Sequence, residues 1–337
     1  KNNLALLIKF RSFKMKKQLL IAAVAATMGT AAMADVSITG QMKVNYKDTD
    51  ANGTLGNAIS HEANLYVTGK TGNTSFRMEL DSDSGDFSAT GNGTSATASD
   101  NTASIDVEDI WMQTSVAGVT LKAGTWNGTD SILSADTTRA AGKFAASGTA
   151  AGVGILVEGS SDANKTVKFS GDIAGVAASY KVEDTQDQIT LAGSVSGVDI
   201  AFHTVNSDTA NSDKTSVSLS TEYNGVTLSY VQADADTSAI ISGDSYFGDV
   251  AAYANPLIGG DDISGFGVKA NLAGNTVQAK AISVDATAAA DDSDIVKLIV
   301  TRPLASGATL EVTYTDEDST TAAMDKETLD IELAVKF

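Results

Sequence analysis

The chain has 337 residues, of which 42% are apolar and 6% aromatic, and it contains no cysteine. The missing cysteines exclude disulfides and thiolate metal sites, and two histidines leave little material for an imidazole-based active site. Acidic residues outnumber basic ones by 42 to 23, so the net charge of −19 argues against nucleic acid as a partner. No cofactor is expected from this composition.

The N-terminal residues have the pattern of a targeting segment. Residues 15–17 read Met-Lys-Lys, an apolar run covers 19–28, and residues 32–34 read Ala-Met-Ala. A charged start, a short apolar region and an A-x-A site are typical of a secretory signal peptide, and the run is shorter than the ~20 residues of a spanning helix. We therefore interpret the chain as three parts: upstream translated sequence (1–14), signal peptide (15–34) and mature domain (35–337). Because the first two parts hold six basic residues and no acidic one, the mature domain has a net charge of −25.

From Asp35 onward the dominant hydrophobic period is two. Apolar side chains at Val36, Ile38, Met42 and Val44 alternate with polar ones, and no helical period competes over a comparable length. The stretch 140–160 alternates least clearly, so a count of sixteen strands stays open beside the eighteen that we count. The eighteen segments are 36–46, 62–69, 74–82, 105–115, 119–126, 140–148, 152–159, 165–171, 175–183, 187–195, 198–205, 214–223, 226–233, 262–272, 276–284, 293–302, 308–316 and 326–337.

The connections between these segments alternate in length. Short ones have turn chemistry, for example Ser196-Gly197 and Asn224-Gly225. Long ones are acidic and rich in Ser, Thr and Gly: 47–60, 84–104, 127–139, 206–213, 234–261, 285–293 and 316–325. Tight turns at one end and long loops at the other predict an all-β fold, a transmembrane antiparallel up-and-down β-barrel of 16–18 strands. In the fourth segment the apolar parity shifts, which predicts a bulge at Glu108-Asp109.

Aromatic residues are sorted to the two ends of the predicted strands. Such belts match the preference of amphipathic rings for both membrane interfaces, which a soluble β-structure or adhesin would not explain. Toward the long loops lie Tyr46, Tyr180, Tyr230 and Tyr314, and beside the short turns lie Phe76, Phe169, Tyr223 and Phe337.

At this point the mature domain resembles the general porins of Gram-negative bacteria. The resemblance rests on the start Val36-Ser37-Ile38-Thr39-Gly40, on the hairpin from Val107-Glu108-Asp109 to Leu121-Lys122-Ala123-Gly124, and on a last strand ending in Phe337. It implies an outer-membrane homotrimer, surrounded by lipid and lipopolysaccharide, that passes small hydrophilic solutes. It also implies a constriction loop after the fifth strand, here 127–139, and makes Phe337 a signal for the barrel-assembly machinery.

The functional site of such a channel is the charge pattern of its narrowest point. Lys43, Arg77 and Lys122 fall on the polar face of the first, third and fifth strands, and Asp130 and Asp136 fall in the expected constriction loop. Opposed rows of unlike charge would create a transverse field that filters solutes. The alternative is that these are ordinary solvated lumen residues.

Three other features of the sequence bear on its function. Asp81, Asp83 and Asp86 hint at a cation site, although the spacing lacks the glycine and glutamate of a calcium loop, so a solvated acidic loop is the default. A substrate-selective channel, for sugars for instance, would need aromatic residues in the lumen, where Trp111 and Trp126 are expected to point. An enzyme is not expected, because His203 has no recognisable nucleophile partner.

Overall fold

The computed structural model describes ten stretches of the mature domain. Every regular element in them is a β-strand, and none of these residues forms a helix long and apolar enough to cross a membrane. The described residues are 35–51, 53–83, 87–90, 106–126, 142–160, 165–208, 213–235, 261–286, 292–320 and 325–337. The expected signal peptide and upstream segment lie outside them.

The strands are long at the start of the domain and short around β6 to β10. In chain order they are β1 (Asp35–Ala51), β2 (Thr54–Thr71), β3 (Thr74–Asp83), β4 (Phe87–Thr90), β5 (Asp106–Val116), β6 (Val119–Thr125), β7 (Lys143–Ala150), β8 (Val153–Gly159), β9 (Lys165–Ile173), β10 (Val176–Val182), β11 (Gln186–Val195), β12 (Val198–Ser207), β13 (Lys214–Tyr223), β14 (Val226–Ala235), β15 (Asp261–Leu272), β16 (Asn275–Ala286), β17 (Ser293–Pro303), β18 (Ala308–Ser319) and β19 (Lys326–Lys336).

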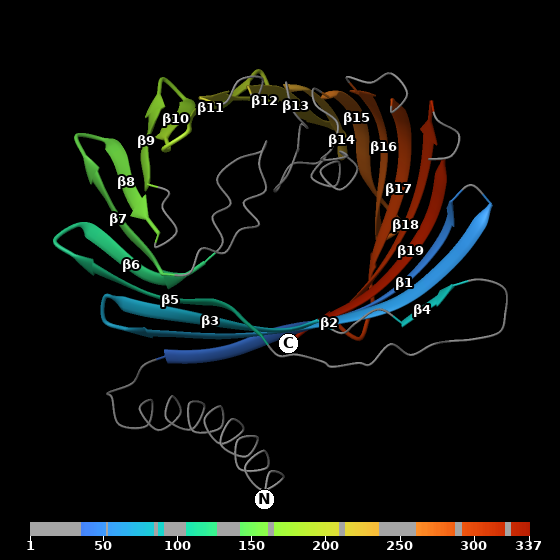
Figure 1. The fold of residues 1–337 in the computed structure, drawn as a ribbon, viewed down its shortest axis with the longest axis horizontal. Helices are drawn as coiled ribbons and strands as arrows, with labels where there is room; N and C mark the ends of the chain where they lie inside the picture. Colours follow the sequence, from blue (N-terminus) through green and yellow to red (C-terminus); the bar gives the residue numbers. More distant parts are fainter. Residues whose placement is uncertain are drawn as a thin grey trace, which may run out of the picture.

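Eighteen of these strands form one closed antiparallel barrel (Figure 1). Each strand pairs with its neighbours in sequence, and β1 pairs with β19 to close the ring. The short strand β4 stands outside the ring, because β3 pairs directly with β5. The predicted all-β barrel is therefore confirmed with eighteen strands, and the weakly alternating stretch 140–160 forms the hairpin of β7 and β8.

Most of the short turns lie at one end of the barrel, and the short connections β1–β2 and β10–β11 lie at the other. Six of them are two-residue turns in which both residues have positive φ, as in Ser196-Gly197 (53° and 80°) and Asn224-Gly225 (52° and 77°). Positive φ at both positions is the type I′ geometry, whose twist matches that of the flanking strands. The turn chemistry therefore sets the register of the hairpins, and with it the face on which each side chain lies.

The predicted bulge in β5 is confirmed. Met78 of β3 pairs with Ile110, whereas Leu80 pairs with Val107, so Glu108 and Asp109 together stand opposite the single residue Glu79. The extra residue reverses the alternation of β5 beyond this point. As a result, Trp111 lies on the inner face while Ile110 and Met112 lie on the outer one, where they are 50% and 58% exposed.

One predicted loop is wrong, and a second contains a short strand. Segment 47–60 is a continuation of the first hairpin, in which Asp48 pairs with Asn57 and Asp50 with Leu55. Strand β3 pairs with β2 only as far as Glu62. Beyond that point residues 56–59 of β2 pair with β4, which lies within the predicted loop 84–104. The hairpin end carries many polar residues, so no apolar period marks it as strand.

The two faces of the barrel differ in chemistry as the alternation predicts. The large apolar side chains with high exposure, such as Ile38, Phe266 and Leu298, share the outer face. Polar and charged side chains alternate with them and therefore point inward.

The barrel closes through a backbone pair at the C-terminus. Gly40 donates its N–H to the Phe337 carbonyl at 2.8 Å, and the Phe337 N–H donates to the Gly40 carbonyl at 2.9 Å. A Cβ atom at Gly40 would stand 2.6 Å from the Phe337 ring, so the missing side chain makes room for the ring. Phe337 thus lies at the closing seam; its role as an assembly signal stays a prediction.

Candidate pore lining

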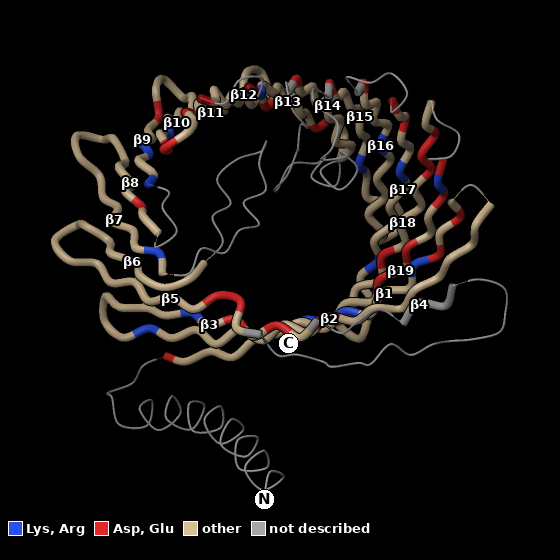
Figure 2. The backbone as a smooth tube through the Cα atoms, in the orientation of Figure 1, with Lys and Arg blue, Asp and Glu red and all other residues tan. Residues whose placement is uncertain are grey.

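Charged residues occur on strands all round the ring (Figure 2). The inner face of the ring is the only surface along which hydrophilic solutes could pass without meeting lipid. The inward side chains are therefore the candidate site.

The predicted basic residue Lys43 lies next to a carboxylate. Its Nζ is 3.6 Å from Glu62 Oε2, on the paired strand β2. The Asn64 amide donates to the same glutamate at 2.7 Å. This part of the wall is therefore an ion pair and not an uncompensated positive charge.

Arg77 is also paired, with a residue of its own strand. Its Nη2 is 2.8 Å from Glu79 Oε2, and its guanidinium lies 4.9 Å from the centre of the Tyr66 ring. The register of β2 and β3 explains the contact, because Tyr66 stands directly opposite Glu79 on the same face. The arginine is thus oriented by a carboxylate and by an aromatic face.

Lys122 lies between two indole rings. Its Nζ is 4.5 Å from the centre of the Trp111 ring and 4.2 Å from that of Trp126. Lys143 extends the arrangement, with its Nζ 5.8 Å from Trp126 and 3.7 Å from Glu158. Trp126 and Lys143 are buried.

These residues form one group, which we call the β2–β8 cluster, because Arg77 stands directly opposite Trp111 on the neighbouring strand. It combines three cations with two carboxylates and three aromatic rings, so its formal charge is positive. Its members are Tyr66, Arg77, Glu79, Trp111, Lys122, Trp126, Lys143 and Glu158.

A second polar network follows on β9 to β11. Glu183 lies 2.8 Å from Lys181 Nζ and accepts hydrogen bonds from Thr166 at 3.4 Å and from Gln188 at 3.1 Å. His203 of β12 is 1% exposed, and its Nδ1 is 2.7 Å from the Thr190 hydroxyl. The polar side chains in this part of the wall are therefore held by one another.

Part of the inner face is apolar, although the alternation in the sequence predicts a polar inner face. Between β12 and β17, a group of inward aliphatic side chains is at most 6% exposed. The strict alternation assigned these positions to a polar face, but register places them side by side, as in the pairs Ile263–Val284 and Ile282–Ile295. The group comprises Val205, Val231, Ala233, Ile263, Ile282, Val284, Ile295 and Ile299.

Acidic residues gather at the barrel end that carries the longer connections. Asp285, Asp292, Asp294 and Asp318 line a depression of about 390 Å³. Asp294 and Asp318 stand directly opposite each other and share the outward parity of Val296 and Tyr314. The outer rim is therefore negative just beyond the apolar band.

The remaining predicted site residues are only partly placed. Asp130 and Asp136, with the whole of the expected constriction loop, lie outside the described residues, as do Asp86 and the side chain of Asp83. Asp81 is buried on β3. No group of three or more metal-ligating side chains that could hold an ion occurs in the described stretches. The structure thus brings Arg77 and Lys122 into one cluster, while Lys43 lies against Glu62 on the neighbouring strands.

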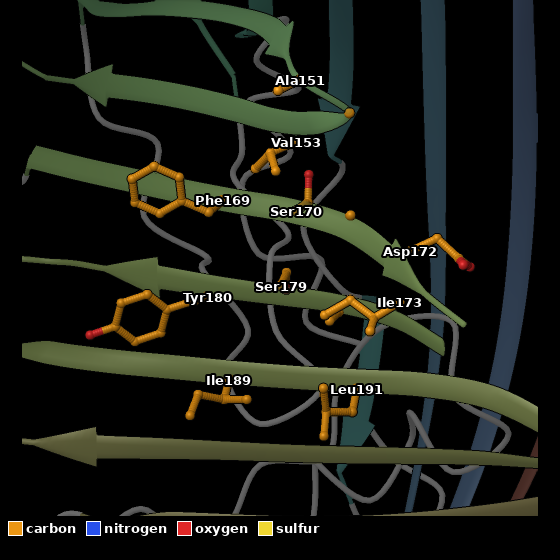
Figure 3. Close-up of a pocket in the computed structure, with 13 residues that line it drawn as sticks. Ala151, Val153, Phe169, Ser170, Asp172, Ile173, Ser179, Tyr180, Ile189 and Leu191 are labelled. Carbon is orange, nitrogen blue, oxygen red and sulfur yellow. The ribbon is translucent and has the colours of Figure 1, made fainter. Parts of the chain in front are cut away.

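The outer face has a groove near the turn end of β8 to β11 (Figure 3). Its volume is about 530 Å³, and Phe169, Tyr180, Ile173 and Leu191 are among the residues that line it. The hollow is open because the paired residues Gly171 and Ala178 are small.

Comparison with known proteins agrees with this architecture. The chain resembles OpdL of Pseudomonas aeruginosa (10% identity, TM-score 0.66, 90% of this chain and 99% of that one). It also resembles a BenF-like porin from Pseudomonas fluorescens Pf-5 (15%, 0.66, 90% and 98%) and OccK2 (OpdF) of Pseudomonas aeruginosa in complex with glucuronate (12%, 0.63, 90% and 98%). At these identities the likeness shows the fold alone. A search of curated protein sequences found no match.

The family follows from the sequence match as well as from the barrel. The model of the Gram-negative porin family matches residues 21–336, nearly the whole chain. Family and fold are those of a channel rather than an enzyme, and they place the protein in the outer membrane of a Gram-negative bacterium. The chain therefore belongs to the Gram-negative porin family, as the resemblance at its two ends and in the β5–β6 hairpin predicted.

Proposed function

We propose that this porin is a water-filled channel for the passive diffusion of small hydrophilic solutes and ions, and that the β2–β8 cluster is its selectivity site. The observation that carries the proposal is the closed ring of eighteen strands with ion pairs and cation–π contacts on its inner face. Charges inside a narrow lumen act more strongly on a passing ion than the same charges in bulk water.

A second candidate function is selective uptake of a particular substrate class. A barrel of eighteen strands would suit it, and one of the similar structures holds glucuronate, a sugar acid. The cluster supplies aromatic rings and cations side by side, which suits a ligand with an apolar face and a negative group. The two functions differ in whether transport saturates.

Swelling of liposomes that contain the purified protein tests both functions. A diffusion channel predicts swelling rates that fall with the size of neutral sugars and rise linearly with their concentration. A selective channel predicts that glucuronate transport saturates and inhibits the passage of smaller solutes. Swelling no faster than in protein-free liposomes would contradict both.

We propose further that three copies assemble through the wall formed by β6 to β10. Three of these strands have seven residues, and seven residues tilted by ~45° span only ~16 Å, less than the ~25 Å apolar band of such barrels. The bilayer would have to become thinner around this short wall. The same wall of another copy has the same height, so contact between copies avoids the thinning. The groove in Figure 3 lies on this wall and offers a hollow for packing.

The other proposed partners are lipid, lipopolysaccharide and the assembly machinery. The acidic outer rim at Asp285, Asp294 and Asp318 supports the second, because divalent cations could bridge these carboxylates to lipopolysaccharide phosphates. The exposed Phe337 at the end of β19 supports the third.

A further inference from the structure

Lys122 differs from four other basic side chains of the inner wall in the kind of partner it has. Lys43, Arg77, Lys143 and Lys181 each lie within 4 Å of a carboxylate oxygen. Lys122 forms no such ion pair within the described part of the chain; its ammonium instead lies between Trp111 and Trp126. Both ring centres are well inside the ~6 Å at which an ammonium is attracted to an aromatic face.

The backbone is shaped to bring the two rings together. Without the bulge at Glu108-Asp109, the alternation of β5 would turn Trp111 toward lipid. On β6, Gly124 stands opposite Trp111 with a φ of 139°, and a Cβ there would lie 2.6 Å from Trp111 Cα and 2.1 Å from the Ile110 carbonyl oxygen. Only glycine allows this approach, so two separate backbone features place one ring.

We propose that Trp111 and Trp126 form an ammonium-binding site in the lumen, which Lys122 fills from within the same chain. The two indoles are positioning residues: they hold the Lys122 charge at one place in the channel instead of leaving a long, flexible side chain in water. Once the lysine side chain is removed, the site accepts a small organic ammonium ion. The effect on ion selectivity rests on the proposed function, whereas the ammonium site itself does not.

The chain offers a specific reporter, because Trp111 and Trp126 are its only tryptophans. We expect tetramethylammonium chloride to change the tryptophan fluorescence of the folded Lys122→Ala protein saturably. Half-saturation should fall on the order of 1–100 mM, as for a weak contact with two rings. The parent protein and Lys297→Ala, in which Lys122 still fills the site, should show no saturable change. Sodium chloride at the same ionic strength corrects for salt effects.

Two results of this titration would overturn the proposal. One is a Lys122→Ala protein with native far-UV circular dichroism that gives no saturable change. The other is an equal response from the parent protein, because the site would then be open although Lys122 is present.

A second measurement tests the positioning role and does not depend on the folding of Lys122→Ala. With Lys122 kept, Trp126→Leu should move the reversal potential in a salt gradient toward cations by at least half the shift of Lys122→Met, while Trp126→Phe should keep most of the parent selectivity. If Lys122→Met shifts selectivity and Trp126→Leu does not, the positioning role is wrong. If neither shifts it but Lys122→Ala binds tetramethylammonium, the ammonium site stands and the proposed selectivity role of the cluster fails.

Discussion

Replacing Leu219 by arginine is expected to destabilise the barrel by ~2–4 kcal/mol, the cost of a basic residue on the lipid face near the membrane midplane. Leu219 lies in the middle of β13, on the outer face between Ile200 and Tyr230. An arginine there would place a charge in the hydrocarbon of the membrane, where no water is present to hydrate it. The free energy of unfolding in lipid vesicles, measured across a urea series by tryptophan fluorescence, gives the value.

The matched control is the next residue of the same strand. Ser220 points into the lumen and stands opposite Asp199 and Ser229. Arginine at this position should change the free energy of unfolding by less than ~0.5 kcal/mol, as for most solvated substitutions. Equal losses at Leu219 and Ser220 would mean that the two faces of β13 have been assigned wrongly.

Neutralising Arg77 and Lys122 together is expected to shift the channel toward cations. The double variant Arg77→Gln/Lys122→Met removes two positive charges from the cluster and leaves Glu79 without its ion-pair partner. If each charge changes the difference in free energy between a cation and an anion in the lumen by on the order of 1 kcal/mol, the cation-to-anion permeability ratio rises roughly fivefold per charge. The reversal potential in a potassium chloride gradient measures this ratio, and the shift should shrink in molar salt.

Charge changes away from the lumen provide the comparison. Arg302→Gln removes a positive charge from an exposed position on the outward face of β17, and should leave the reversal potential unchanged. Neutralising Asp285, Asp294 and Asp318 at the rim should have a small effect, because β19 and β1 separate β18 from β2 and salt screens exposed charges beyond ~8 Å. The sequence also predicts that Asp130→Asn/Asp136→Asn moves selectivity toward anions. A larger shift from the rim variants than from Arg77 and Lys122 would show that total charge sets selectivity.

Much of the fold could be predicted because strands and turns of a membrane barrel depend on residues that are close together in the sequence. Alternation of apolar side chains follows from the two-residue period of a strand between lipid and water, and turns such as Asn224-Gly225 follow from the need for positive φ. Even the bulge at Glu108-Asp109 was visible as a change of parity. The family resemblance rested on the same local patterns.

The details of the candidate site depend on contacts that alternation does not encode. It places Arg77, Lys122 and Trp111 on one face, but only the register between strands puts Arg77 against Glu79 and Lys122 between two indoles. Alternation also assigned the positions of the inner apolar group around Ile263 and Ile295 to the polar face, and it could not predict that apolar side chains would pack there. The end of the first hairpin was predicted as a loop because its many polar residues leave no hydrophobic period to follow.

The central claim, that ions pass along the inner face at the β2–β8 cluster, is tested most directly by single-channel current during thiol modification. The chain has no cysteine, so Gln113→Cys and Met112→Cys each carry one thiol. Gln113 stands opposite Lys122 on the inner face, whereas Met112 is 58% exposed on the outer face. A small anionic methanethiosulfonate should lower the conductance of Gln113→Cys in discrete steps and leave Met112→Cys unchanged. An unchanged current through a labelled Gln113→Cys channel would contradict the claim.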